Sequence, residues 1–261
     1  LALGMSLVIY LGHIDLSVGA AAAFTGVVAA SFLKGGTPML LTILLVAFIG
    51  MGIGLANGVI VTKVRIPFFI TTLAMMSILT GAGFLITGGY PISLLPKSWH
   101  ILGRFYLWVI PMPTIIMFCM YILFQIIQSR SRLGRYIYAV GGNETAARLC
   151  GINVDRIKII AYILCGLLAS IGGMILCSRL DSGDPSIGAP FLLSSIAAPI
   201  LGGTKLSGGE GRIMGTLLGA LILGIIDNGL SLMNVNIYYQ YVVKGLIILA
   251  VVVPQIEHRV K

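Results

Sequence analysis

Residues 129–158 read SRSRLGRYIYAVGGNETAARLCGINVDRIK and form the only long stretch of the chain that is both polar and strongly basic. The stretch holds six of the seventeen lysine and arginine residues, and long apolar runs flank it on both sides. A basic loop between apolar runs is typical of a connection at a membrane surface. This pattern predicts a chain that crosses a membrane and presents residues 129–158 to a partner there.

The composition excludes a soluble globular protein. Of 261 residues, 58% are hydrophobic and 10% are charged, whereas soluble domains carry roughly 25% charged residues. A spanning helix needs about 20 apolar residues, and the long runs lack the period-two alternation of a transmembrane barrel. We therefore expect one all-α, polytopic membrane domain over residues 1–261, with about eight spans. The candidate runs lie at about 14–33, 39–61, 68–87, 107–128, 159–180, 190–203 (short and broken by Pro199), 212–233 and 241–256.

The first residues of the chain do not resemble a targeting segment. Leu1 lies inside the apolar run LALGMSLVIYLG, which has no polar flank. This run lacks the basic start and the cleavage site of a signal peptide. We expect at least one helix upstream of Leu1 to be missing.

The basic residues predict the orientation, because lysine and arginine concentrate in cytoplasmic loops. Twelve of the seventeen fall on one face of the predicted topology and five on the other. The loops at 62–67, 129–158 and 204–212 and the C-terminus are thus expected inside the cell. These residues are divided among loops beside a membrane and form no single stripe with aromatic residues between them, which disfavours nucleic-acid binding.

A short helix is predicted inside the basic loop. Asn143 is a good N-cap for a helix over residues 144–150, and Gly151 suits the position after its end. Such a short helix is marginal in water, so something should pack against it. Ala146 and Ala147 would allow close approach of a protein groove; an interfacial helix lying on lipid headgroups is the alternative reading.

Polar residues within the apolar runs are candidates for a substrate pathway, because charges in a membrane usually face protein, water or substrate. Asp15 and Ser17 lie in the segment HIDLSVG, and Asp227 and Asn228 lie about 15 residues into the 212–233 run. Asn57 joins these candidates because its amide both donates and accepts hydrogen bonds, as sugar hydroxyls require.

Three of these residues also have a purely structural interpretation. Asp15 would cap a helix that starts directly after it, and Asn57 would bond across helices. Asp227 would form an ion pair, for which Lys244 is one candidate partner.

Several catalytic chemistries are excluded by missing motifs. LSGGE at 206–210 looks like the signature loop of ABC ATPases, but no GxxxxGK[ST] phosphate loop occurs, so the match is expected to be coincidental. Neither GxSxG nor HExxH is present, the three histidines are scattered, and no CxxC pair suggests a metal. We expect a transport subunit without a cofactor or metal of its own, and no enzyme.

The loop sequence GRYIYAVGGNETAARLCGINVDRIK is similar to the cytoplasmic loop of permease subunits of bacterial ABC importers for ribose, galactose, xylose and related monosaccharides. Four further segments resemble this family in order and spacing. They are GHIDLSVGA at 12–20, GLANGVIVTKVRIPFFITTLAM at 54–75, ILGGTKLSGGEGRIMGTLLGALILGIIDNG at 200–229 and YYQYVVKGLIIL at 238–249.

The resemblance implies a multi-pass protein of the bacterial inner membrane that forms a homodimer. It further implies cytoplasmic ATPase subunits that bind ATP and magnesium, and an extracytoplasmic sugar-binding protein. In this family the loop helix is the coupling helix, which fits a groove on the ATPase. The positions that match are Gly141, Gly142, Asn143, Glu144, Ala146, Ala147, Arg148 and Gly151. Cys150 stands where the family usually has serine, and Asp227 where it usually has asparagine.

Two other transport functions compete with this reading. An ABC permease for nucleosides or branched-chain amino acids would share the architecture. A secondary transporter driven by an ion gradient would need intramembrane carboxylates, and only Asp15 and Asp227 qualify. The sequence of this chain is not expected to reveal which sugar is carried.

Overall fold

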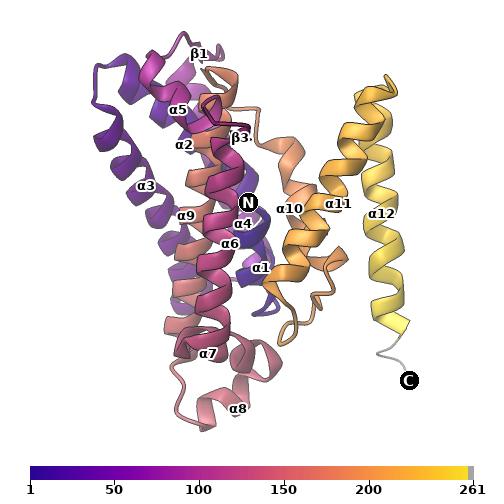
Figure 1. Ribbon diagram of the computed structural model, residues 1–261. Coiled ribbons are helices and arrows are strands. Elements are labelled where there is room, and N and C mark those ends of the chain that lie inside the picture. Colours follow the sequence, from indigo (N-terminus) through magenta and orange to yellow (C-terminus); the bar gives the residue numbers. More distant parts are fainter. Residues whose placement is uncertain (258–261) are drawn as a thin grey trace.

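The computed structural model describes residues 1–257 and is a bundle of helices (Figure 1). The prediction of an all-α membrane protein is confirmed. The longer elements are α1 (Ala2–Ile9), α2 (Val18–Lys34), α3 (Met39–Val59) with the π-helix η1 (Ile60–Val64), α4 (Phe68–Thr87), α6 (Met112–Arg130), α7 (Arg132–Gly142), α8 (Glu144–Leu149), α9 (Val154–Leu180), α10 (Ala189–Leu201), α11 (Ile213–Leu232) and α12 (Ile237–Glu257).

Five helices in the described part of the chain are long and apolar enough to cross a membrane: α3 with η1, α4, α6, α9 and α11. The apolar helices α2 and α10 are shorter, with 17 and 13 residues. All eight predicted runs correspond to helices, although several starts differ. α2 begins four residues later than predicted because residues 10–17 form an irregular loop, and α6 begins five residues later because a hairpin precedes it.

Helix α9 lies at the centre of the bundle and packs against α1, α2 and α3 (Figure 1). Small residues allow this close packing. A Cβ atom on Gly166 of α9 would collide with the carbonyl oxygen of Gly50, and one on Gly54 of α3 would meet the backbone of Tyr162. Close backbone approach at small residues is how helices associate in a membrane, where apolar side chains gain nothing by leaving lipid.

Helices α10, α11 and α12 pack on one another, and α1 connects them to α9. The sequence predicted a kink or break at Pro199. The structure instead places Pro199 in the last turn of α10, which ends two residues later at Leu201. Proline therefore lies where the helix stops, because it would disrupt a longer one.

The two ends of the bundle differ in character. At one end, Lys63 Nζ lies 2.9 Å from Asp155 Oδ2, and the hydroxyl of Tyr138 donates to the carbonyl of Gly211 at 2.9 Å. The loops at 62–67, 129–158 and 204–212, which the sequence assigned to one membrane face, thus meet here. We call this the basic end; its cytoplasmic location stays a prediction.

The opposite end carries two small antiparallel strand pairs and the short helices η2 (Lys97–Trp99) and α5 (His100–Gly103). Strand β1 (Ile92–Ser93) pairs antiparallel with β4 (Ser182–Gly183), and β2 (Tyr106–Leu107) with β3 (Ile110–Pro111). His100 Nε2 lies 3.0 Å from Asp181 Oδ1, which fastens α5 to the end of α9.

Candidate functional site

The candidate coupling site is α8, which projects from the basic end (Figure 1). Its N-cap is Asn143, whose side-chain oxygen accepts from the N–H group of Ala146 at 2.9 Å. At its other end Gly151 has φ +80°, a conformation that glycine adopts without steric cost. The predicted short capped helix is confirmed.

A Schellman motif ends α8 and turns the chain toward α9. The N–H group of Gly151 donates to the carbonyl of Arg148 at 2.9 Å, and that of Ile152 donates to Ala147 at 3.0 Å. Asn153 then caps α9 by accepting from the N–H group of Arg156 at 3.1 Å. The direction of α8 relative to α9 is therefore set by hydrogen bonds at both of its ends.

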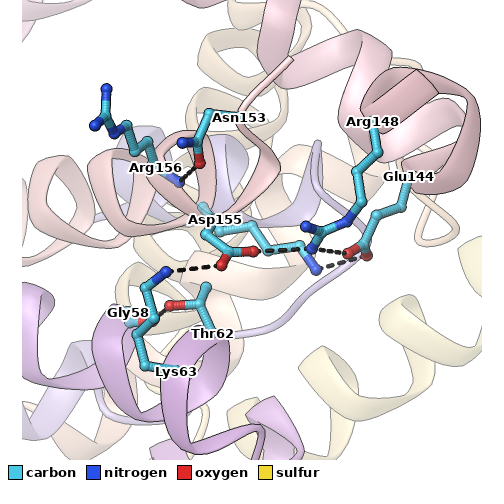
Figure 2. Close-up of polar contacts among 9 residues, drawn as sticks. Gly58, Thr62, Lys63, Glu144, Arg148, Asn153, Asp155 and Arg156 are labelled. Carbon is cyan, nitrogen blue, oxygen red and sulfur yellow. Dashed lines mark hydrogen bonds and ion pairs between the residues drawn. The ribbon is translucent and has the colours of Figure 1, made fainter. Parts of the chain in front are cut away.

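Five charged side chains fasten α8 to the spans (Figure 2). Glu144 accepts from Lys158 Nζ at 2.7 Å and from Arg148 Nη2 at 3.1 Å. The same Arg148 nitrogen lies 2.8 Å from Asp155, whose other oxygen binds Lys63 at 2.9 Å. An isolated exposed pair contributes only about 0–1 kcal/mol, but here the pairs share partners and link α8, α9 and η1. We call these five residues the ion network.

The hydrogen bond from Lys158, assisted by Arg148, holds the pKa of Glu144 below its ordinary value. A depressed pKa means that ionised Glu144 favours the folded state at neutral pH, and that this contribution is lost as the pH falls through the lowered pKa. Glu144 therefore contributes a negative charge to the ion network at neutral pH.

The two faces of α8 differ. Ala147 is only 4% exposed and lies in a hydrophobic cluster with Val154 and Ile157 of α9. The sequence grouped Ala147 with the small residues that would approach a partner, whereas the structure turns it inward. Leu149, in contrast, is 85% exposed, beside exposed Ala146 and Cys150. The outward face of α8 therefore carries one large apolar side chain and two small ones, which are exposed in the described part of the chain.

The backbone of α7, the helix directly before α8, comes into close contact with the end of α1 and with the 204–212 loop. A Cβ atom on Gly141, near the end of α7, would collide with the carbonyl oxygen of Tyr10, which itself accepts from Gly209. Gly208 and Gly209 have φ of +83° and +76°, and a Cβ atom on Gly208 would lie 3.0 Å from the Gly141 oxygen. We call Tyr10, Gly141, Gly208 and Gly209 the glycine junction. The LSGGE segment thus has a structural role within this chain.

Three of the predicted pathway residues lie together. Asp15 Oδ1 accepts from the N–H group and the hydroxyl of Ser17 at 2.9 and 2.6 Å. Asn57 Nδ2 donates to Ser17 Oγ at 2.9 Å, across from α3. All three are buried. Asp15 binds the turn before α2 and not a helix starting at Leu16, because α2 begins at Val18. We call Asp15, Ser17 and Asn57 the Asp15 cluster; in the chain, Asp15 follows Tyr10 of the glycine junction by five residues.

The other two predicted pathway residues, Asp227 and Asn228, lie on α11. Asp227 Oδ2 is 2.9 Å from Lys244 Nζ of α12, so Lys244 is confirmed as the ion-pair partner. The second oxygen of Asp227 is buried without a hydrogen-bond partner among the described residues. The pair borders a cavity of ≈ 330 Å³ that Ser194 and Phe191 of α10 also line. Asn228 is exposed.

Sequence reasoning missed the amphipathic helix α7, the exposed Leu149 and the ion network. The sequence did contain signals for the start of α7 and for one pair of the ion network. Ser131 is a typical N-cap residue, and its hydroxyl accepts from the N–H group of Gly134 at 3.1 Å. Glu144 and Arg148 have the i,i+4 spacing of a helical ion pair. The contact between Lys63 and Asp155 joins residues 92 positions apart and has no local signal.

Comparison with known proteins decides the family. The family model described as "Branched-chain amino acid transport system / permease component" matches residues 1–252. The chain belongs to this family. It is a permease subunit of the ABC importer type, a multi-pass protein of the bacterial inner membrane and not an enzyme. This confirms the resemblance noted in the five sequence segments.

Among curated relatives, the chain is 47% identical over 256 residues to the ribose import permease protein RbsC of Escherichia coli K12. The match covers 97% of this chain and 80% of the relative. It is 44% identical to RbsC of Bacillus subtilis (97% and 79% coverage) and 37% identical to the L-arabinose transport system permease protein AraH of E. coli K12 (97% and 77%). No solved structure matches the chain.

Proposed function

We propose that this permease carries a monosaccharide such as ribose or arabinose into the cell, driven by ATP that separate cytoplasmic subunits bind. The names of the relatives at 37–47% identity support a sugar as the substrate, in preference to a branched-chain amino acid. The single observation that supports ATP coupling is α8, a capped helix with an uncovered outer face that the ion network fastens to the spans.

In this proposal, α8 binds a groove of the ATPase, and movement of the ATPase is transmitted along two routes. The first route is the ion network, which joins α8 to α9 and η1. The second is the glycine junction, where α7 touches the end of α1 directly before the Asp15 cluster. The first route consists of ion pairs, and the second combines a close backbone contact at Gly141 with the hydrogen bond from Gly209 to Tyr10, so both connect the basic end to the spans.

The substrate pathway is proposed to include the Asp15 cluster and the Asp227 region. Asp227 and Ser194 border the same cavity and offer an acceptor and a hydroxyl, while Phe191 offers an aromatic face. Polar groups that both donate and accept, next to an apolar surface, suit a sugar. The sugar-binding protein and a second copy of the permease complete the proposed importer.

Labelling of the native Cys150 tests this proposal. In the full-length permease, Cys119, Cys165, Cys177 and any cysteine upstream are replaced by serine, so that only exposed Cys150 reacts. An impermeant maleimide should leave Cys150 unlabelled in intact cells and label it in inside-out vesicles. Bound ATPase subunits should then protect it, because they cover α8.

The control is Leu94→Cys in the same background without Cys150, since Leu94 is 79% exposed at the opposite end. It should react in intact cells and be insensitive to the ATPase. Labelling of Cys150 in intact cells would refute the orientation. Equal labelling with and without the ATPase would refute the docking of α8.

A further inference from the structure

The hairpin of β2 and β3 carries an unbroken run of exposed apolar side chains at the end opposite the basic end. Tyr106 pairs with Pro111 and Leu107 with Ile110, so that Trp108 and Val109 form the tip. Trp108 is 97% exposed and Val109 82%, and the flanking residues from 105 to 110 are 46–60% exposed. Exposed apolar patches of this kind mark an interaction with another surface.

The base of the hairpin is fastened to the bundle. The N–H group of Met112 donates to the carbonyl of Phe105 at 2.9 Å, which closes the loop. Just before it, Arg104 Nε donates to the carbonyl of Arg179 at the end of α9, also at 2.9 Å. The hairpin is therefore a defined projection whose apolar tip is not folded back onto the helices.

Its position relates it to the lipid-facing surface of α6, which starts at Met112 directly after the hairpin. Along α6 the apolar residues Phe118, Ile122 and Ile126 are 46–60% exposed, as expected of a helix that faces acyl chains. No charged residue occurs between Arg104 and Arg130. Residues 111–117, between the hairpin and Phe118, are partly exposed, so the uncharged surface of the span continues into the hairpin.

We propose that this hairpin inserts its tip into the lipid headgroup region of the membrane leaflet at this end. Tryptophan and tyrosine are enriched at that depth, because they combine an apolar ring with one polar group. A docking surface for a water-soluble protein would carry a polar rim, whereas the charged Arg104 beside the hairpin is already engaged with α9. The inserted hairpin would fix the depth at which α6 begins.

Tryptophan fluorescence tests the proposal, because this chain has only two tryptophans and Trp99 is fully buried. The full-length permease and its Trp108→Phe variant are reconstituted into phosphatidylcholine–phosphatidylglycerol vesicles, and the difference between their spectra isolates Trp108. Lipids brominated near the headgroup should quench this signal at least threefold more than lipids brominated near the chain end. Aqueous iodide should quench it weakly.

The matched control carries Lys97→Trp in the Trp108→Phe background, since Lys97 is exposed at the same end but outside the hairpin. Its signal should respond to iodide and not to brominated lipid. A Trp108 signal that behaves like this control would overturn the proposal. A Trp108 signal shielded from both quenchers would also overturn it, because a protein surface, either a second permease copy or the binding protein, would then cover the hairpin.

Discussion

Leu149→Asp is expected to reduce ATP-driven transport strongly while the permease remains folded in the membrane. Leu149 is 85% exposed on the outward face of α8 and makes no contribution to the buried clusters. A charge placed in an apolar contact with the ATPase would remain unpaired and desolvated. Loss of a hot-spot contact in an interface costs about 2 kcal/mol or more, which would correspond to about a 30-fold loss of affinity for the ATPase subunits.

The measurement is co-purification of the ATPase with the full-length permease, together with uptake of labelled sugar. Leu94→Asp is the matched control: Leu94 is similarly exposed, at 79%, but lies at the opposite end. It should leave ATPase binding unchanged. Normal ATPase binding by Leu149→Asp, with undiminished uptake, would contradict the assignment of α8 as the coupling helix.

Gly141→Ala should destabilise the permease, whereas Gly142→Ala should not. A methyl group on Gly141 would collide with the carbonyl of Tyr10 and approach Gly209 N at 2.7 Å, but one on Gly142 meets nothing within 4 Å. Forcing an extra methyl group into a packed site costs about 1–3 kcal/mol. The atoms in the way here belong to the backbone, which can move less than a flexible side chain. We expect the thermal unfolding midpoint to fall by about 5 °C and uptake to fall at least tenfold.

Thermal unfolding of the two purified variants, followed by fluorescence, measures this difference. Gly142 lies in the last turn of α7, where alanine is compatible with helical backbone and should be neutral or stabilising by about 0.5 kcal/mol. If the two variants had the same midpoint and the same uptake, the glycine junction would have no role in stability or transmission.

The spans, the capped helix α8 and the pair of Asp227 with Lys244 were predictable because their signals are local or strong. Apolar runs of about 20 residues predict spans directly, and Asn143 and Gly151 carry the chemistry of helix ends. Charges within the membrane are so few that the sequence could offer Lys244 as one candidate partner of Asp227, and the structure pairs them.

Other features depend on contacts between distant segments. Alanine at 147 looks the same in the sequence as alanine at 146, and only the turn of α8 onto α9 decides which of them is buried. The glycine junction joins residues near 10, 141 and 209, whose proximity follows from packing of the whole bundle. The start of α6 was misplaced because the apolar hairpin before it resembles a span in composition.

The most direct test of the proposed ATP-driven import is sugar uptake into vesicles containing the full-length permease. With the ATPase subunits, the binding protein and ATP, labelled ribose or arabinose should accumulate, and Asp227→Asn should keep much of this activity because an amide still bonds to a hydroxyl. The permease alone, under a proton or sodium gradient, should move no sugar. Gradient-driven uptake by the permease alone, lost in Asp227→Asn, would contradict the account and identify an ion-coupled transporter.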